Sequence, residues 1–210
     1  IALMNSVVGN YLLSLSNPTL SFQVENILAL PVIVDEHEFS AIVELAERAI
    51  SLSKNSWDHD EISWNFRRHM FIGDYSSIED ASRDWSEVSY NEHQELREIE
   101  EQLNKKFISI YGFQGILDYT VDPSNVNYKV ANKREDVVAF LSYAVGCMLG
   151  RYSLSTDGIS FAGGDWCQEK YKIFAPDRDG IIPLCDDEYF EDDVVGYLVK
   201  IGRASCRERV

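Results

Sequence analysis

The stretch LSYAVGCMLGRYSL at residues 141–154 decides how the fold of this chain is interpreted. It ends an almost entirely apolar run, residues 137–149, that is interrupted only by one serine and one glycine. A helix without a polar face is buried in a core or a membrane, and this run is too short for a bilayer span, which needs about 20 residues. We therefore predict a central core helix, capped by Asn132 at its start and by a left-handed Gly150 at its end.

Two further helices are predicted upstream of the central one. The first begins at Asp35, which forms a capping-box pattern with Glu38, and it stops near Asn55. The second is the longest periodic segment, residues 78–111, which has an apolar stripe beside an acidic face and ends at Gly112. The stripe consists of Ala81, Trp85, Val88, Leu96, Ile99, Leu103 and Phe107.

The shorter segments between and after these helices are predicted to be extended runs, loops and turns. Residues 22–24 and 27–34 are predicted as two extended runs, because a proline and β-branched residues mark them. Residues 57–68 are predicted as an ordered loop packed by three aromatic side chains, namely Trp57, Trp64 and Phe66. After Arg151, short apolar runs alternate with Gly, Pro and Asp, which is typical of strands and turns. The predicted fold class is mainly α with short β segments (α+β).

Composition limits the classes of function. The formal net charge is −16, which is unusual for a nucleic-acid-binding protein because phosphate contacts need clustered Lys and Arg. The cysteines, at positions 147, 167, 185 and 206, lie far apart without C-x-x-C spacing, so reduced thiols are expected rather than a zinc site or a disulfide framework. Neither a signal peptide nor a membrane span is predicted, and we expect a cytoplasmic protein without membrane contact.

The last ten residues, IGRASCRERV at positions 201–210, place three arginines in an otherwise acidic chain. This string resembles the translation of a common sequencing-library adapter. We expect it to be an artefact and leave it out of the reasoning about the fold.

No catalytic, cofactor-binding or metal-binding residue is predicted. The Asp177-x-Asp179-Gly180 stretch puts alanine where a calcium loop needs its first acidic ligand, and the carboxylates of residues 186–193 suit the first turn of a helix. The histidines lack metal-binding spacing, and Gly163-Gly164 lacks the third glycine of a dinucleotide fingerprint.

Aromatic residues next to arginines remain as candidates for DNA contact, because such pairs can stack on a base and bind a phosphate. The candidates in the site prediction are Arg151, Tyr152, Arg67 and Arg68. The alternative is structural: the arginines lie over aromatic faces and pack against acidic neighbours.

Three stretches together resemble one family. SNPTLSFQVENILALPVI at residues 16–33 is similar to the strand that ends the catalytic domain of large adenine-specific DNA methyltransferases, and WDHDEISWNFRRHMFI at 57–72 is similar to a segment downstream of it. The stretch 141–154, followed by FAPDRDGIIPLCDDEYFEDDVVGYL at 174–198, resembles the PglX methyltransferases of BREX phage-exclusion systems.

This resemblance implies a parent enzyme that methylates the N6 atom of adenine with S-adenosylmethionine and binds double-stranded DNA, with other phage-defence components as possible partners. The Asn-Pro-Pro-aromatic loop of such enzymes is absent, because Asn17-Pro18-Thr19-Leu20 lacks the second proline and the aromatic residue. The chain is therefore expected to be a fragment that binds no cofactor itself. Residues 1–34 would be the tail of the catalytic domain, 35–150 a helical spacer, 151–200 the start of a target-recognition region and 201–210 the artefact.

The mechanistic hypothesis is that the spacer holds the recognition region at a fixed distance from the catalytic pocket, with Arg151 near the junction. Arg151→Ala is then expected to weaken DNA binding or methylation more than Arg97→Ala. Two alternatives without enzymatic activity stay open at this point: an acidic helical interaction module, and a DNA mimic whose carboxylates take the place of phosphates.

Overall fold

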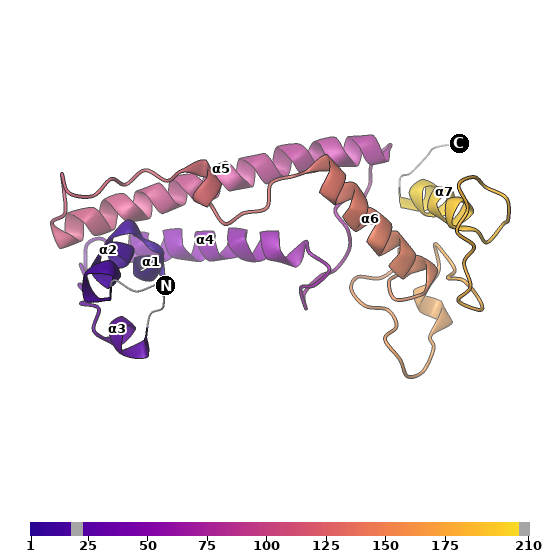
Figure 1. The fold of residues 1–210 in the computed structure, drawn as a ribbon, viewed down its shortest axis with the longest axis horizontal. Coiled ribbons are helices and arrows are strands. Elements are labelled where there is room, and N and C mark those ends of the chain that lie inside the picture. The colour runs from indigo at the N-terminus through magenta and orange to yellow at the C-terminus, as the bar shows by residue number, and fades with distance from the viewer. Residues whose placement is uncertain (18–22, 206–210) are drawn as a thin grey trace. The chain divides into compact units, whose positions relative to one another are not determined.

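The computed structural model describes residues 1–17 and 23–205, which are mainly helical (Figure 1). The elements in chain order are α1 (Ala2–Asn5), α2 (Val7–Ser16), α3 (Val24–Leu28), α4 (Phe39–Asp58), α5 (Ile78–Tyr111), the 3-10 turn η1 (Pro123–Asn125), α6 (Lys133–Met148), the 3-10 turn η2 (Gln168–Lys170) and α7 (Val194–Ser205). Within these described ranges no strand forms, and one isolated bridge joins Ser153 and Thr156. The mainly helical prediction is confirmed, whereas the predicted β segments are not formed in this part of the chain.

The chain divides into two compact units. Unit 1 consists of Ile1–Lys54 and Asn91–Tyr128, and unit 2 consists of Asn55–Tyr90 and Lys129–Val210. Helices α4 and α5 contribute residues to both units. The division into catalytic tail, spacer and recognition region concerns function, and it stays a prediction.

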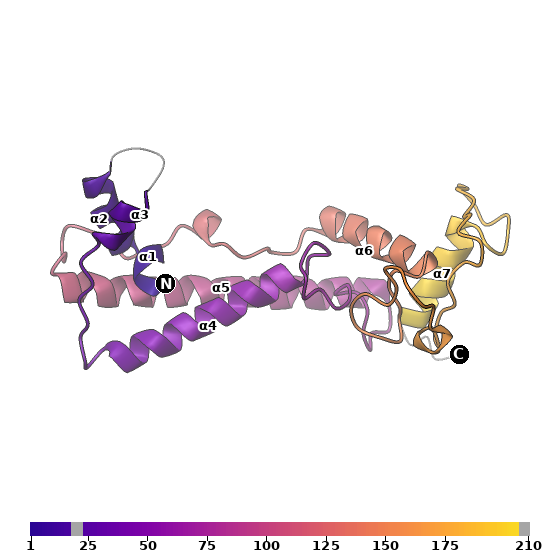
Figure 2. The same cartoon turned by 90° about the horizontal axis from the view of Figure 1, so that it is seen from below.

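Unit 1 is organised around α4 and the second half of α5, which share one core; the helices run alongside each other in Figure 1 and cross at an angle in Figure 2. Arg48 on α4 forms an ion pair with Glu95 on α5, with 2.6 Å between Nε and Oε1. The core of the unit consists of Val8, Leu52, Leu96, Ile99, Leu103, Phe107, Ile108, Val126 and Tyr128. The second half of the predicted α5 stripe is thus buried. Helix α5 also ends as predicted, because Gly112 follows it with a φ of 71°.

Two predictions about the first forty residues are wrong. Val24–Leu28 form the helix α3 instead of extended runs, and Asn26 stabilises its first turn by accepting a hydrogen bond from the Gln23 N–H at 2.8 Å. Phe22, which the prediction included, lies outside the described residues. Asp35 closes a turn by accepting from two following backbone N–H groups, and α4 starts only at Phe39. A capping pattern therefore marked the correct region but not the first helical residue.

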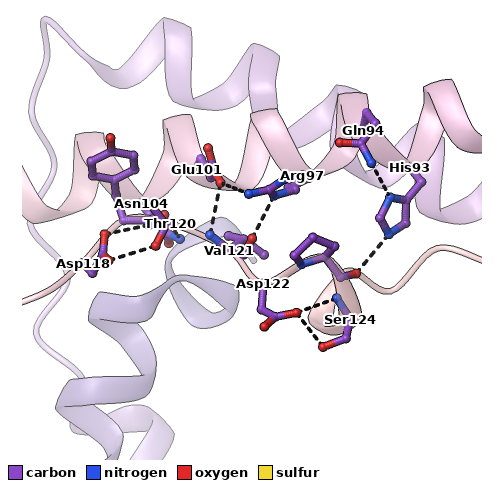
Figure 3. A network of polar contacts seen from close by, with 12 residues as sticks. His93, Gln94, Arg97, Glu101, Asn104, Asp118, Thr120, Val121, Asp122 and Ser124 are labelled. Atoms are coloured by element: carbon purple, nitrogen blue, oxygen red, sulfur yellow. Dashed lines mark hydrogen bonds and ion pairs between the residues drawn. The ribbon is translucent and has the colours of Figure 1, made fainter.

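The segment after α5 returns along the helix, and side chains of α5 hold its backbone (Figure 3). Arg97 Nε–H donates to the Val121 carbonyl at 2.8 Å, and Glu101 accepts from the Val121 N–H at 3.2 Å. One helical turn further, the Asn104 amide donates to the Tyr119 carbonyl at 3.1 Å. Spacings of three and four residues place these side chains on one face of α5, so the extended segment needs no strand partner to satisfy these backbone groups.

Unit 2 is organised around α6, which contains the first part of the stretch 141–154, up to Met148. The Asn132 side chain accepts hydrogen bonds from two N–H groups of the first turn, and Gly150 has a φ of 80°, so both predicted caps are confirmed. The buried face consists of Asp136, Phe140, Tyr143, Ala144, Cys147 and Met148. The opposite apolar face is partly exposed, at Val138, Leu141, Val145 and Leu149. The prediction of a fully buried helix is therefore wrong for this chain, because the described residues cover α6 on one face only.

The first half of α5 and the aromatic loop also belong to unit 2. Ala81 and Trp85 are buried as the stripe predicts, while Val88 is partly exposed. Of the three aromatic residues expected to pack the loop, only Phe66 is buried; Trp57, which falls in the last turn of α4, and Trp64 are exposed.

Part of the C-terminal string that was left out of the reasoning about the fold is packed in unit 2. Ile201 is fully buried in the core of unit 2, and residues up to Ser205 continue α7. Residues 206–210 of the expected artefact lie outside the described residues. The origin of the string stays a prediction.

A search of the described residues finds no helix that is both long enough and apolar enough to cross a lipid bilayer.

Candidate DNA-contact site

The arginines singled out from the sequence come together in unit 2, although more than eighty positions separate them. The Gly158 N–H donates to the Arg67 carbonyl at 2.7 Å, and the Ser160 N–H donates to the Arg151 carbonyl at 2.8 Å. Gly158 has a φ of 74°, which glycine adopts without strain, so the chain can turn here. One loop, residues 151–160, therefore holds both arginine-bearing segments, and we call this arrangement the arginine loops.

Two of the arginines have no carboxylate partner among the described residues. Arg67 is exposed, and its side chain makes no hydrogen bond or ion pair there. Arg151 is exposed as well, and its Nε–H donates to the Tyr152 hydroxyl at 3.2 Å. A guanidinium without a carboxylate partner keeps its donors for an anion such as a phosphate.

The third arginine is already paired. Arg68 Nε lies 2.8 Å from Asp157 Oδ1, and a second guanidinium nitrogen binds the same oxygen. Both side chains are nearly half exposed, so the pair is screened and contributes little to stability. The ion pair neutralises the charge of Arg68 and attaches the loop 151–160 to the Arg68 side chain through Asp157.

Tyr152 does not present its ring to a ligand. The side chain is 2% exposed, and the ring stacks on Tyr143 with 5.0 Å between centroids and packs edge-on against Phe66 at 5.5 Å. Burial raises the pKa of its phenol. A Cβ at Gly146 would lie 2.5 Å from this ring, so the glycine inside α6 makes room for it. The predicted stacking of Tyr152 on a base is therefore corrected: the ring is buried and supports the loop. The Arg151 guanidinium lies over this ring, 5.5 Å from its centroid, as well as donating to its hydroxyl.

Arg97, the comparison residue of the sequence hypothesis, has a structural role. It donates to the Val121 carbonyl, and its guanidinium lies 3.3 Å from Glu101 (Figure 3). Its replacement would disturb unit 1, so it is unsuitable as a neutral control. Arg83 on α5 is a better one, because its side chain is 71% exposed and makes only a surface pair with Asp80.

The pockets of the described residues are not lined as a site for S-adenosylmethionine would be. Three of them have volumes of about 300, 540 and 610 Å³, within the range of ligand pockets. None of the three is lined by a glycine-rich turn, and the acidic residues that line them are Glu100 and Asp118. Gly163 and Gly164 both have positive φ values, but nothing lies within 4 Å of a Cβ placed there. These residues do not fit the cofactor, and we derive no step through it.

Carboxylates near the C-terminus are occupied by the backbone. Asp193 is fully buried, accepts from the N–H groups of Tyr189 and Phe190, and accepts from Gly196 N–H at 2.7 Å at the start of α7. Asp177 accepts from the Tyr197 hydroxyl and from the Gly180 N–H. Across the described ranges, no group of three or more His, Cys, Asp or Glu side chains is placed to hold a metal ion.

Two curated proteins are similar to nearly the whole chain, whereas no protein-family model matches it. Adenine-specific methyltransferase PglX of Lacticaseibacillus casei (strain Zhang) is 37% identical over 199 residues, which are 92% of this chain and 16% of that protein. Adenine-specific methyltransferase BrxX of Escherichia coli O9:H4 (strain HS) is 32% identical over 225 residues, 97% of this chain and 18% of that protein. The chain thus spans about a sixth of the length of these relatives, and its homologues are the PglX and BrxX adenine-specific methyltransferases of BREX systems.

Proposed function

We propose that this chain is a non-catalytic region of an adenine-specific DNA methyltransferase that acts in phage defence. In the complete enzyme it positions the target-recognition region relative to the catalytic domain and contacts double-stranded DNA through the arginine loops. The complete enzyme uses S-adenosylmethionine as methyl donor, and the cofactor binds outside this chain.

The observation that carries the DNA contact is the joining of Arg67 and Arg151 by one loop. Each guanidinium is exposed and without a carboxylate partner, in a chain with a net charge of −16. Two phosphates of one strand can be contacted from such a pair, and each contact adds a counterion-release contribution to binding. The proposal keeps Arg68 as a support for the loop, because Asp157 already neutralises it.

The positioning role is supported by α5. A helix of 34 residues is about 51 Å long at 1.5 Å per residue. This helix contributes residues to both compact units and so connects them, as a spacer between two regions must. The relatives' identity as adenine-specific methyltransferases favours this function over the interaction module and the DNA mimic.

The test measures the affinity of the chain for a 20-base-pair duplex between 25 and 200 mM salt, conditions chosen to expose the phosphate contribution. Arg67→Ala and Arg151→Ala are each expected to weaken binding and to reduce the slope of log K against log salt by about 1. Arg83→Ala is the matched control, expected to leave slope and affinity unchanged. Equal effects of all three substitutions, or no binding at 25 mM salt, would reject the DNA contact.

A further inference from the structure

Trp64 is the most exposed large apolar side chain of the described residues. It is fully solvent-exposed, whereas Trp85 is 5% exposed and Trp57 and Trp166 are about half exposed. A tryptophan loses much of its favourable transfer free energy when water surrounds the whole indole ring. The whole indole ring of Trp64 is therefore available for a contact with another molecule.

The turn that carries Trp64 is well anchored. The neighbouring Ser63 is buried, its N–H donates to the Asp60 carbonyl at 2.9 Å, and its hydroxyl donates to Asp58 at 2.6 Å. On the other side, the Phe66 N–H donates to the Ser63 carbonyl at 3.1 Å, and the Phe66 ring is buried. The indole therefore projects from a fixed backbone, which lowers the entropy cost of using it in binding.

Arg67 is the cation near Trp64 that has no carboxylate partner among the described residues. It is three residues away from Trp64, so the two Cα atoms are at most about 11 Å apart. Three carboxylates of the same segment keep their negative charge: Asp58 and Glu61 accept from the hydroxyls of Ser63 and Ser142, and Asp60 lies 3.9 Å from Lys129 Nζ. An anionic ligand is therefore held by Arg67 and not by the segment as a whole.

We propose that Trp64 stacks on a base of double-stranded DNA at a position where the base has lost its neighbour, while Arg67 contacts the adjacent phosphate. This inference rests on the proposed function, because an enzyme that methylates the adenine amino group must take the base out of the stack and leaves an unstacked face beside it. An aromatic side chain covers such a face irrespective of its sequence.

The experiment compares two duplexes that differ only by one abasic position, which leaves its neighbouring bases unstacked. The chain is expected to bind the abasic duplex about 10-fold more tightly than the intact one, within the range of one base stacked on an aromatic ring. Trp64→Ala is expected to remove this preference without changing the salt slope, and Trp64→Phe to retain part of it. Trp57→Ala, the matched control on the exposed end of α4, is expected to keep the preference.

The outcomes separate this inference from the proposed function. If Arg67→Ala lowers the salt slope while Trp64→Ala leaves the ratio of the two affinities unchanged, the stacking role is wrong and the DNA contact stands. If neither duplex binds, both are wrong. If Trp64→Ala leaves DNA binding intact but prevents association with another protein of the defence system, the indole is a protein contact and the proposal is overturned.

Discussion

Protonation of His69 is expected to destabilise unit 2. The imidazole is 1% exposed and lies among aromatic rings, with centroids 4.8 Å from Phe71 and 5.5 Å from Phe140. Its Nδ1 accepts from the Phe71 N–H at 3.1 Å, so the neutral ring carries its proton on Nε2, which has no hydrogen-bond partner in the described part of the chain. Burial lowers the pKa of His69 from 6.5 to about 4.

The size of the effect follows from these two pKa values. A shift of one pKa unit corresponds to about 1.4 kcal/mol, so the full loss is about 3 kcal/mol. The folded pKa lies below the unfolded one, and the unfolded chain therefore binds more protons between pH 6.5 and 4. The contribution of the neutral ring to the free energy of unfolding is complete above pH 6.5, falls as the pH drops through this window, and is lost below pH 4. Between pH 7 and 5 the expected loss is about 2 kcal/mol.

Urea unfolding at pH 7 and pH 5 measures this loss. His69→Asn removes the titration but keeps an oxygen that can accept from the Phe71 N–H, so the difference between the two pH values should shrink by about 2 kcal/mol relative to the unsubstituted chain. The exposed His37, substituted in the same way, controls for a general effect of removing an imidazole. An unchanged pH dependence in the His69→Asn chain would refute the reasoning.

Three further substitutions test the caps and the network. Asn132→Ala removes the N-cap of α6 and is expected to lower the free energy of unfolding by about 1 kcal/mol, with Asn132→Asp restoring most of it; equal losses in both chains would contradict the capping role. Gly150→Ala should cost at least about 1 kcal/mol, because φ is 80° and the new Cβ would lie 3.0 Å from the Trp166 ring, and an unchanged midpoint of unfolding would contradict this. Arg97→Ala leaves the Val121 carbonyl without its donor and is expected to lower stability by about 1–3 kcal/mol, measured by urea unfolding, whereas a neutral result would show that water replaces the guanidinium.

Local signals in the sequence placed several elements correctly. The apolar period and Gly112 gave the bounds of α5, and Asn132 and Gly150 gave the caps of α6, because capping depends on residues within one turn of the helix end. The carboxylates of residues 186–193 were predicted for the first turn of a helix, but they all precede α7, which starts at Val194. Asp193, directly before the helix, accepts from the Gly196 N–H of its first turn.

The features that could not be predicted from the sequence depend on packing between segments that lie far apart in the chain. The apolar run of α6 contains no information about which face the rest of the chain covers, so its exposed side, with Leu141, was not foreseen. Tyr152 and Trp64 both stand next to arginines or near them in sequence, yet one ring is buried against Tyr143 and the other is fully exposed. The burial of Tyr152 depends on its contacts with Phe66 and Tyr143, and Phe66 lies far from it in the sequence. No local sequence pattern predicts such a long-range contact.

The most direct test of the central claim is N6-methyladenine in the DNA of cells that express a chimera. In it, residues 1–200 of this chain replace the matching stretch of the Lacticaseibacillus casei PglX protein. The expected result is methylation that Arg151→Ala reduces strongly and Arg83→Ala leaves intact. A soluble chimera that leaves the DNA unmethylated, or equal losses in the two variants, would contradict the account.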